Sequence, residues 1–133
     1  MKIRSLWCAV AGMSIACAPE PTTPATTDLA GSWTSTARIA TLSGFTLSLI
    51  QEPKGIVSGG WTAKGETGEP GCVPNVPCTK TGRVIGRSTV AQLELLLITG
   101  GRFDGVFIEP KTLRGMFNTS GGADTITFVR TGR

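Results

Sequence analysis

Apolar and polar side chains alternate along most of the chain from residue 29 onward, and this period of two constrains the fold more than any other feature. Phe45, Leu47 and Leu49 fall on one face of a run, while Thr46 and Ser48 fall on the other. Successive side chains of a β-strand point to opposite faces. A strand with one apolar and one polar face is typical of an antiparallel sheet that buries a single side. The alternation therefore predicts an all-β fold.

Short strand-like runs recur between residues 31 and 130, separated by turn residues in a chain with 18 glycines and 8 prolines. None has the apolar spacing of three and four residues that a helix longer than two turns needs. A helical turn fits only at Ala37–Leu42 and around Val90–Leu97. The eight predicted strands are Gly31–Thr36, Phe45–Gln51, Val57–Ala63, Thr81–Ser88, Val90–Ile98, Arg102–Ile108, Thr112–Asn118 and Asp124–Arg130.

The connections between these runs are mostly as short as hairpin loops, with Lys64–Lys80 as the long exception. Closing such a meander into a barrel removes its exposed edges. Several runs also carry glycine at inward positions, which lets a strand coil sharply. These glycines are Gly59, Gly86, Gly105 and Gly115. We therefore predict one small eight-stranded antiparallel up-and-down meander barrel over residues 29–133.

The first residues have the features of an export signal. Basic Met1–Arg4 precedes Ser5–Ile15, an uncharged and mostly apolar stretch of 11 residues. That length suits a signal peptide and is too short to cross a bilayer as a permanent helix. The stretch leads into Ser14-Ile15-Ala16-Cys17, which resembles the lipobox of bacterial lipoproteins, although Ser14 stands where Leu is usual. The resemblance implies a signal peptide over residues 1–16 and acyl chains such as palmitate on Cys17.

Residues 17–28 are rich in Pro and Thr, as expected of an extended tether between a lipid and a folded domain. We therefore expect an envelope protein held to a membrane by its N-terminal lipid, at the periplasmic face of the outer membrane. Two alternatives stay open. An ordinary secretory signal cut near Ala16 or Ala18 would leave a soluble periplasmic protein, and an uncut segment would be an N-terminal anchor helix.

The four cysteines divide in an orderly way under this interpretation. Cys8 lies inside the signal, and Cys17 takes the lipid. Cys72 and Cys78 remain, and in an oxidising compartment we expect them to form a disulfide that closes a small loop. A metal site is the poorer alternative, because two thiols do not complete a tetrahedral set and the chain has no histidine. We expect no metal and no cofactor.

The two ends of the predicted barrel resemble the calycin group, which includes lipocalins and avidins. The first run opens with Gly31-Ser32-Trp33, and the last ends at Arg130. In that group a first-strand Trp packs across the closed barrel end and a basic residue of the last strand covers it. The resemblance implies this end motif for Gly31, Trp33 and Arg130, and a cation–π contact is its physical basis. The resemblance does not imply a biotin site in this chain.

The function predicted from the sequence is a non-catalytic binding or structural role. The inward side chains could line an apolar cup for a small ligand, or they could simply fill a barrel that is just wide enough to be packed solid. The candidate ligand-binding residues are Trp33, Phe45, Leu47, Leu49, Trp61, Leu95, Phe103 and Phe117. The alternative is an envelope protein-interaction module, such as an inhibitor of a protease or lysozyme, that presents the tether or the Lys64–Lys80 loop.

Two other classes are disfavoured by composition. Without Lys2 and Arg4, 11 basic residues face 9 acidic ones, a balance of +2, and the basic residues are scattered. A nucleic-acid surface needs clustered cations with stacking aromatics, so we expect no nucleic-acid partner. An enzyme is the weakest hypothesis, because the chain has no His and no Tyr and no serine in a nucleophile-elbow pattern. We expect no catalytic residues.

Overall fold

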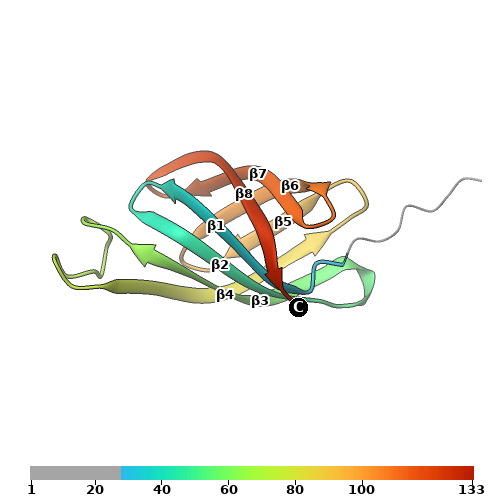
Figure 1. Ribbon diagram of the computed structural model, residues 1–133, viewed down its shortest axis with the longest axis horizontal. Helices are drawn as coiled ribbons and strands as arrows, with labels where there is room; N and C mark the ends of the chain where they lie inside the picture. The colour runs from blue at the N-terminus through green and yellow to red at the C-terminus, as the bar shows by residue number, and fades with distance from the viewer. Residues whose placement is uncertain (1–27) are drawn as a thin grey trace, which may run out of the picture.

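The computed structural model describes residues 28–133, and these form a closed antiparallel barrel whose eight strands are neighbours in chain order (Figure 1). The strands are β1 (Gly31–Ile39), β2 (Leu42–Gln51), β3 (Ile56–Gly65), β4 (Cys78–Ser88), β5 (Leu93–Leu97), β6 (Gly101–Glu109), β7 (Thr112–Thr119) and β8 (Gly122–Gly132). This confirms the predicted all-β up-and-down barrel, an architecture compatible with the calycin group. The predicted signal over residues 1–16, Cys17 and the tether before Asp28 lie outside the described residues.

The start of β5 differs from the prediction because local hydrogen bonds form a turn there. The run expected at Val90–Ile98 starts too early, because Thr89 and Gln92 close a turn around Val90. The Thr89 amide donates to the Gln92 carbonyl at 2.8 Å, and the Gln92 amide donates to the Thr89 hydroxyl at 3.1 Å. The Thr89 hydroxyl thus stabilises a turn that the apolar pattern does not reveal. Strand β5 is left with five residues.

Helical structure also lies elsewhere than expected. Ala37–Leu42, expected as a place for a helical turn, instead contains the end of β1, a tight turn and the start of β2. A single 3₁₀ turn, η2 (Pro53–Gly55), connects β2 to β3, with proline in its first turn. Within residues 28–133, no helix has the length and apolarity needed to cross a membrane.

The barrel interior is filled by one cluster of buried apolar side chains. Its aromatic rings meet edge to face: the centroids of Phe45 and Phe117 are 5.1 Å apart, and those of Phe103 and Phe128 are 5.4 Å apart. Aromatic pairs in this geometry gain stability beyond the area they bury. The inward alternation predicted from the sequence therefore produces a continuous packed core.

Two inward glycines make room for the Phe103 ring. Gly105 and Gly115 face each other on β6 and β7, and a Cβ at Gly105 would lie 2.5 Å from the Phe103 ring. A Cβ at Gly115 would lie 2.4 Å from the Gly105 Cα and 2.1 Å from the Asp104 carbonyl oxygen. These glycines let two strands approach under an aromatic ring, which is the role expected of inward glycine in a small barrel.

The barrel closes where β1 meets β8, and this seam is short. Three residue pairs align along it, one of which is Trp33 with Arg130. The Arg130 guanidinium carbon lies 4.7 Å from the centroid of the Trp33 ring, and the indole nitrogen donates to the Leu29 carbonyl at 2.9 Å. Gly31 has a φ of 123°, and a Cβ there would lie 2.3 Å from the Gly132 carbonyl oxygen. The seam thus requires glycine at the start of β1.

Replacement of Gly115 by Ala tests the close approach of β6 and β7. The new Cβ would meet backbone atoms that cannot rotate away, so we expect Gly115→Ala to lower the free energy of unfolding by about 1–3 kcal/mol, typical of overpacking. Gly122→Ala is the matched control, because nothing lies within 4 Å of a Cβ there. Urea unfolding followed by tryptophan fluorescence measures both. Equal stability of the two variants would contradict the packing described for Gly115.

Candidate functional site

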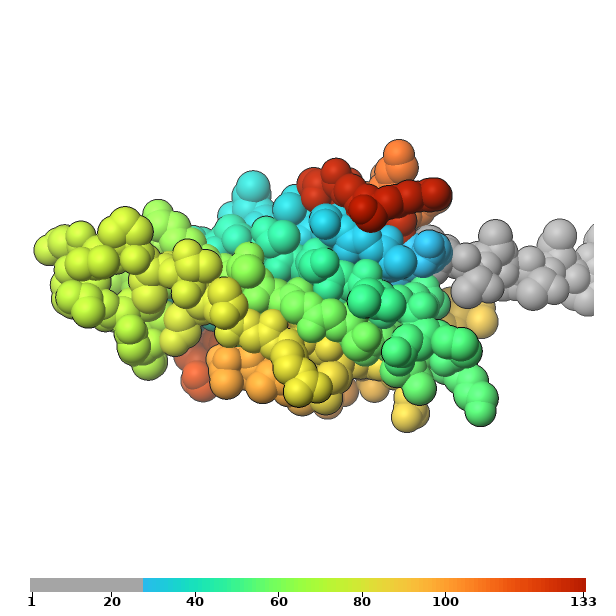
Figure 2. Space-filling model, turned by 90° about the horizontal axis from the view of Figure 1, so that it is seen from below, coloured from blue at the N-terminus to red at the C-terminus, as the bar shows by residue number. Residues whose placement is uncertain are grey.

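The connection between β3 and β4 lies at the opposite end of the barrel from the start of β1. The β1–β2 turn pairs Ile39 with Leu42, and Leu42 in turn pairs with Gly65, so the connection extends from the end where β1 finishes. Since β1 has nine residues, the two barrel ends are about 30 Å apart at the usual rise per residue. We call these the tether end, where Asp28 and Gly132 lie, and the loop end. Figures 1 and 2 show the β3–β4 connection projecting beyond the remaining strands.

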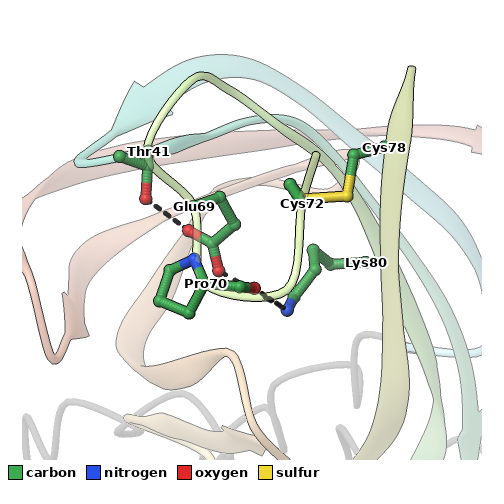
Figure 3. The surroundings of a disulfide bond; sticks show 6 residues. All are labelled: Thr41, Glu69, Pro70, Cys72, Cys78 and Lys80. Carbon is green, nitrogen blue, oxygen red and sulfur yellow. Dashed lines mark hydrogen bonds and ion pairs between the residues drawn. A yellow bond between two sulfur atoms is a disulfide. The ribbon is translucent and has the colours of Figure 1, made fainter. Parts of the chain in front are cut away.

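A disulfide between Cys72 and Cys78 closes the tip of this connection, as predicted (Figure 3). Gly65 pairs with Cys78 across the two strands, and a Cβ at Gly65 would lie 2.5 Å from the Cys72 sulfur. The disulfide therefore packs directly against a position that only glycine can occupy. Gly65 is a residue of the site that the cysteine spacing alone did not indicate.

The disulfide ring presents a tight turn with an apolar surface. The Val76 amide donates to the Val73 carbonyl at 3.3 Å, and Asn75 between them has a φ of 61°. Proline at the second position and a positive φ at the third are typical of a type II β-turn. Val73 and Val76 are 66% and 57% exposed. The turn thus holds two valines in water at the far tip of the molecule.

The base of the connection is fastened to the turn between β1 and β2. The Glu66 amide donates to the Thr41 carbonyl at 2.7 Å, and the Ser43 hydroxyl donates to the Glu66 carboxylate at 2.7 Å. The Thr41 hydroxyl donates to the Glu69 carboxylate (Figure 3). Hydrogen bonds to an ionised carboxylate are stronger than neutral ones. Two acidic residues therefore hold the long loop against a separate hairpin.

A lysine of β4 braces the same loop from the other side. The Lys80 ammonium donates to the Pro70 carbonyl at 2.7 Å and lies 3.7 Å from the Glu69 carboxylate (Figure 3). Lys80 alternates with Thr79 and Thr81 along β4, so its stem points to the inner side of the sheet, where the loop folds back. Together with the disulfide, this contact orders the loop before any partner binds, which lowers the entropy lost on binding.

The pKa of Glu66 is lowered from its ordinary value of 4.5. The largest cause is the hydrogen bond from the Ser43 hydroxyl, followed by the positive charge of Lys64, whose ammonium lies 3.9 Å from the carboxylate. Burial acts in the opposite direction, and Arg38 adds a smaller attraction. The bracing of the loop thus depends on an ionised carboxylate.

A pocket of about 300 Å³ lies between the start of the connection and its tip. It is open to solvent and is lined by Lys64, Gly65, Glu66, Thr67, Gly68, Cys72, Val73, Pro74, Asn75, Val76 and Pro77. The lining is mostly backbone and short side chains. The two titratable side chains of the lining, Lys64 and Glu66, lie 3.9 Å apart and belong to the bracing of the loop.

The eight apolar residues predicted as an internal ligand cup all lie in the packed core and are 0–3% exposed. None of them lines any of three pockets found along the described chain, which open at the loop end, at the tether end and on the outer wall. The end-motif residues Gly31, Trp33 and Arg130 lie together in the seam described above, where the Arg130 guanidinium also donates to the Asp28 carbonyl.

Within residues 28–133, no group of three or more Cys, Asp or Glu side chains is close enough together to hold a metal ion. Glu94 and Asp104 are both paired with Arg102 on the outer wall, at 3.5 Å and 2.9 Å. The residues that brace the loop, Thr41, Ser43, Glu66, Glu69 and Lys80, were not predicted. Their sequence positions give no signal, because each contact depends on how the loop folds back against β4 and the β1–β2 turn.

Acidification should loosen the loop before the barrel unfolds. Because the folded pKa of Glu66 is lowered, its stabilising contribution is present above 4.5 and is lost as the pH falls through the folded value. We expect the melting temperature of the native protein to fall more steeply between pH 6 and pH 3 than that of Glu66→Gln. Ser43→Ala removes the hydrogen bond that contributes most to the lowered pKa of Glu66, so it should also reduce the dependence of the melting temperature on pH. Parallel melting profiles for all three proteins would show that this carboxylate is not coupled to folding.

Comparison of the chain with models of protein families, with curated proteins and with solved structures finds no significant match.

Proposed function

We propose that this protein is a lipid-anchored component of the bacterial cell envelope, acylated at Cys17, whose barrel has a non-catalytic binding role. The proposal takes its anchor from the lipobox-like Ser14–Cys17 and from the Pro/Thr-rich tether that follows. The predicted small calycin-like barrel then serves as a rigid body. The single observation that favours a binding role is the braced, disulfide-closed tip with two exposed valines at the loop end.

The position of this tip supports contact with another protein. The tether joins the barrel at the tether end, so the loop end is the part of the domain farthest from the point where the chain leaves for the lipid. Val73 and Val76 lie on a turn that is fixed before binding, and preorganised apolar side chains bind at a low entropic cost. A partner with a small apolar pocket fits such a tip.

The turn also defines the mode of contact. An inhibitor that mimics a substrate strand must present an extended segment, whereas Asn75 bends the chain sharply with its φ of 61°. The tip therefore has a shape that can insert into a pocket of a partner protein. An envelope enzyme such as a protease or lysozyme remains the expected class of partner, with its pocket filled by the Val73–Val76 turn.

A small apolar ligand inside the barrel is less well supported by the geometry. The core side chains already meet one another, as in the contact between Phe45 and Phe117. A ligand would have to displace buried aromatic groups, and removal of one such group from a core costs about 3–5 kcal/mol. The surface of the loop end offers binding without that cost.

The lipid anchor is tested by metabolic labelling with an alkyne analogue of palmitate. We expect the native protein and Cys8→Ser to take up the label, since Cys8 lies within the predicted signal. Cys17→Ser should take up none, because it lacks the thiol that carries the lipid. A labelled Cys17→Ser, or an unlabelled native protein, would overturn the anchor.

The protein contact is tested by photo-crosslinking in living cells. A photoreactive amino acid at Val76 should give a discrete adduct with an envelope protein, and Val73→Asp in the same chain should abolish it by placing a charge in the apolar contact. The same probe at Met116, which is exposed on β7, is the matched control and should give no such adduct. Equal crosslinking at Val76 and Met116 would contradict the proposal that the loop tip is the contact surface.

A further inference from the structure

The outer wall of the barrel carries a group of exposed aliphatic side chains on and directly after four neighbouring strands, β2 to β5. We call it the aliphatic patch, and its members are 37–60% exposed. They are Ile50, Ile56, Ile85, Leu96 and Ile98. Ile85 on β4 lies directly opposite Leu96 on β5, and only Ser58 separates Ile85 from Ile50. Directly opposed side chains on one face of a sheet are in contact distance.

The opposite wall has a smaller apolar group. Val106 there lies opposite Arg114 and, among aliphatic residues, shares the outward face of β6 only with Ile108, while Met116 lies between Asp104 and Thr125. Val129 on β8 is flanked by Thr34 and Thr112. Single exposed aliphatic residues among polar neighbours are normal on a protein surface, whereas contiguous ones mark an interaction site. The two walls therefore differ in arrangement rather than in the amount of exposed apolar side chain.

Charge distinguishes the patch further. The outward positions of β2, β3 and β4 carry no acidic side chain, while Lys64, Arg83 and Arg87 stand among them. Arg83 and Arg87 are on either side of Ile85 along β4, and within residues 28–133 neither forms an ion pair. The acids that border the patch are Glu52 and Glu94. Glu52 is exposed beside Ile50 and Ile56 at the end of β2, and its amide donates to the Ile56 carbonyl at 2.8 Å. Glu94 lies opposite Arg87 and contacts Arg102. Aliphatic groups bordered by arginine match the apolar and anionic layers of a phospholipid surface.

The tether reaches the barrel beside this patch. The Leu29 amide donates to the Gln51 side chain at 2.8 Å, so the incoming chain is fixed to the end of β2, next to Ile50. Eleven residue-to-residue steps join Cys17 to Asp28, so this stretch spans at most about 40 Å when fully extended. A lipid on Cys17 therefore keeps the β2 end of the patch within tether length of a bilayer.

We propose that the aliphatic patch rests on the surface of an anionic phospholipid bilayer, so that the β2–β5 wall of the barrel lies against the membrane. The green to yellow part of this wall, β2 to β4, faces the reader in Figure 2. This inference rests on the proposed lipid anchor, because a patch of this size needs the lipid to hold it near the membrane. In this orientation β8, the strand farthest from β4 around the barrel, faces away from the membrane. The disulfide-closed tip then extends along the membrane and stays free to meet a partner.

Depth-dependent quenching on the mature acylated protein tests this orientation. Ile85→Cys and Val129→Cys, each labelled with a polarity-sensitive fluorophore, form a matched pair, since these outward aliphatic positions are 43% and 47% exposed on opposite walls. The proteins are reconstituted into phosphatidylethanolamine/phosphatidylglycerol vesicles that contain a headgroup nitroxide lipid. We expect a blue shift and strong quenching at position 85, and neither at position 129. Arg83→Gln with Arg87→Gln should weaken the quenching at position 85.

Each other outcome overturns the inference in a distinguishable way. Protein that floats with the vesicles but shows equal quenching at the two positions retains its anchor and has no preferred face. A blue shift at position 85 that depends on protein concentration and not on the nitroxide lipid assigns the patch to a second copy of the chain. Protein that carries no acyl group and does not float overturns the lipid anchor and the inference with it.

Discussion

Closure of the barrel depends on the contact between Arg130 and Trp33. The β1–β8 seam has only three aligned residue pairs, compared with ten between β3 and β4, so side chains carry much of the joining there. The guanidinium lies over the indole ring, and its neighbouring nitrogen donates to the Asp28 carbonyl. An arginine over an aromatic face combines cation–π attraction with burial of its stem. Every other neighbouring pair of strands has at least five aligned residue pairs, so this seam has the fewest.

The neighbouring strands β1 to β4 position the loop. Because β1 and β2 end beside β3, the Thr41 and Ser43 hydroxyls meet the two glutamates of the β3–β4 connection. The disulfide orders the tip of that connection, and Lys80 orders its base. The shape of the binding surface therefore depends on the ladders that hold β1 to β4 side by side.

The period-two alternation was sufficient to predict the strands and their order, because burial of one face fixes which residues point inward. The disulfide could also be predicted, since only Cys72 and Cys78 remained for it. The start of β5 could not, because a Thr89 hydroxyl bond overrides an apolar run. The loop bracing could not either, since the Thr41–Glu69 bond joins residues 28 apart whose meeting depends on the path of the long loop. Whether the apolar residues formed a cup or a core depended on volumes that alternation does not specify.

The place of the seam in the chain has a consequence for the order of folding. Trp33 lies in the first strand and Arg130 in the last, so the contact that closes the barrel joins the two extremes of the domain. A chain made from its N-terminus exposes the apolar face of β1 until the final strand emerges. The six-residue separation of the disulfide, by contrast, allows the loop tip to form early and locally. During synthesis the disulfide-closed loop can therefore form while the strands are still an open sheet. The apolar face of that sheet stays exposed until β8 is made, and the chain is prone to aggregation during this time.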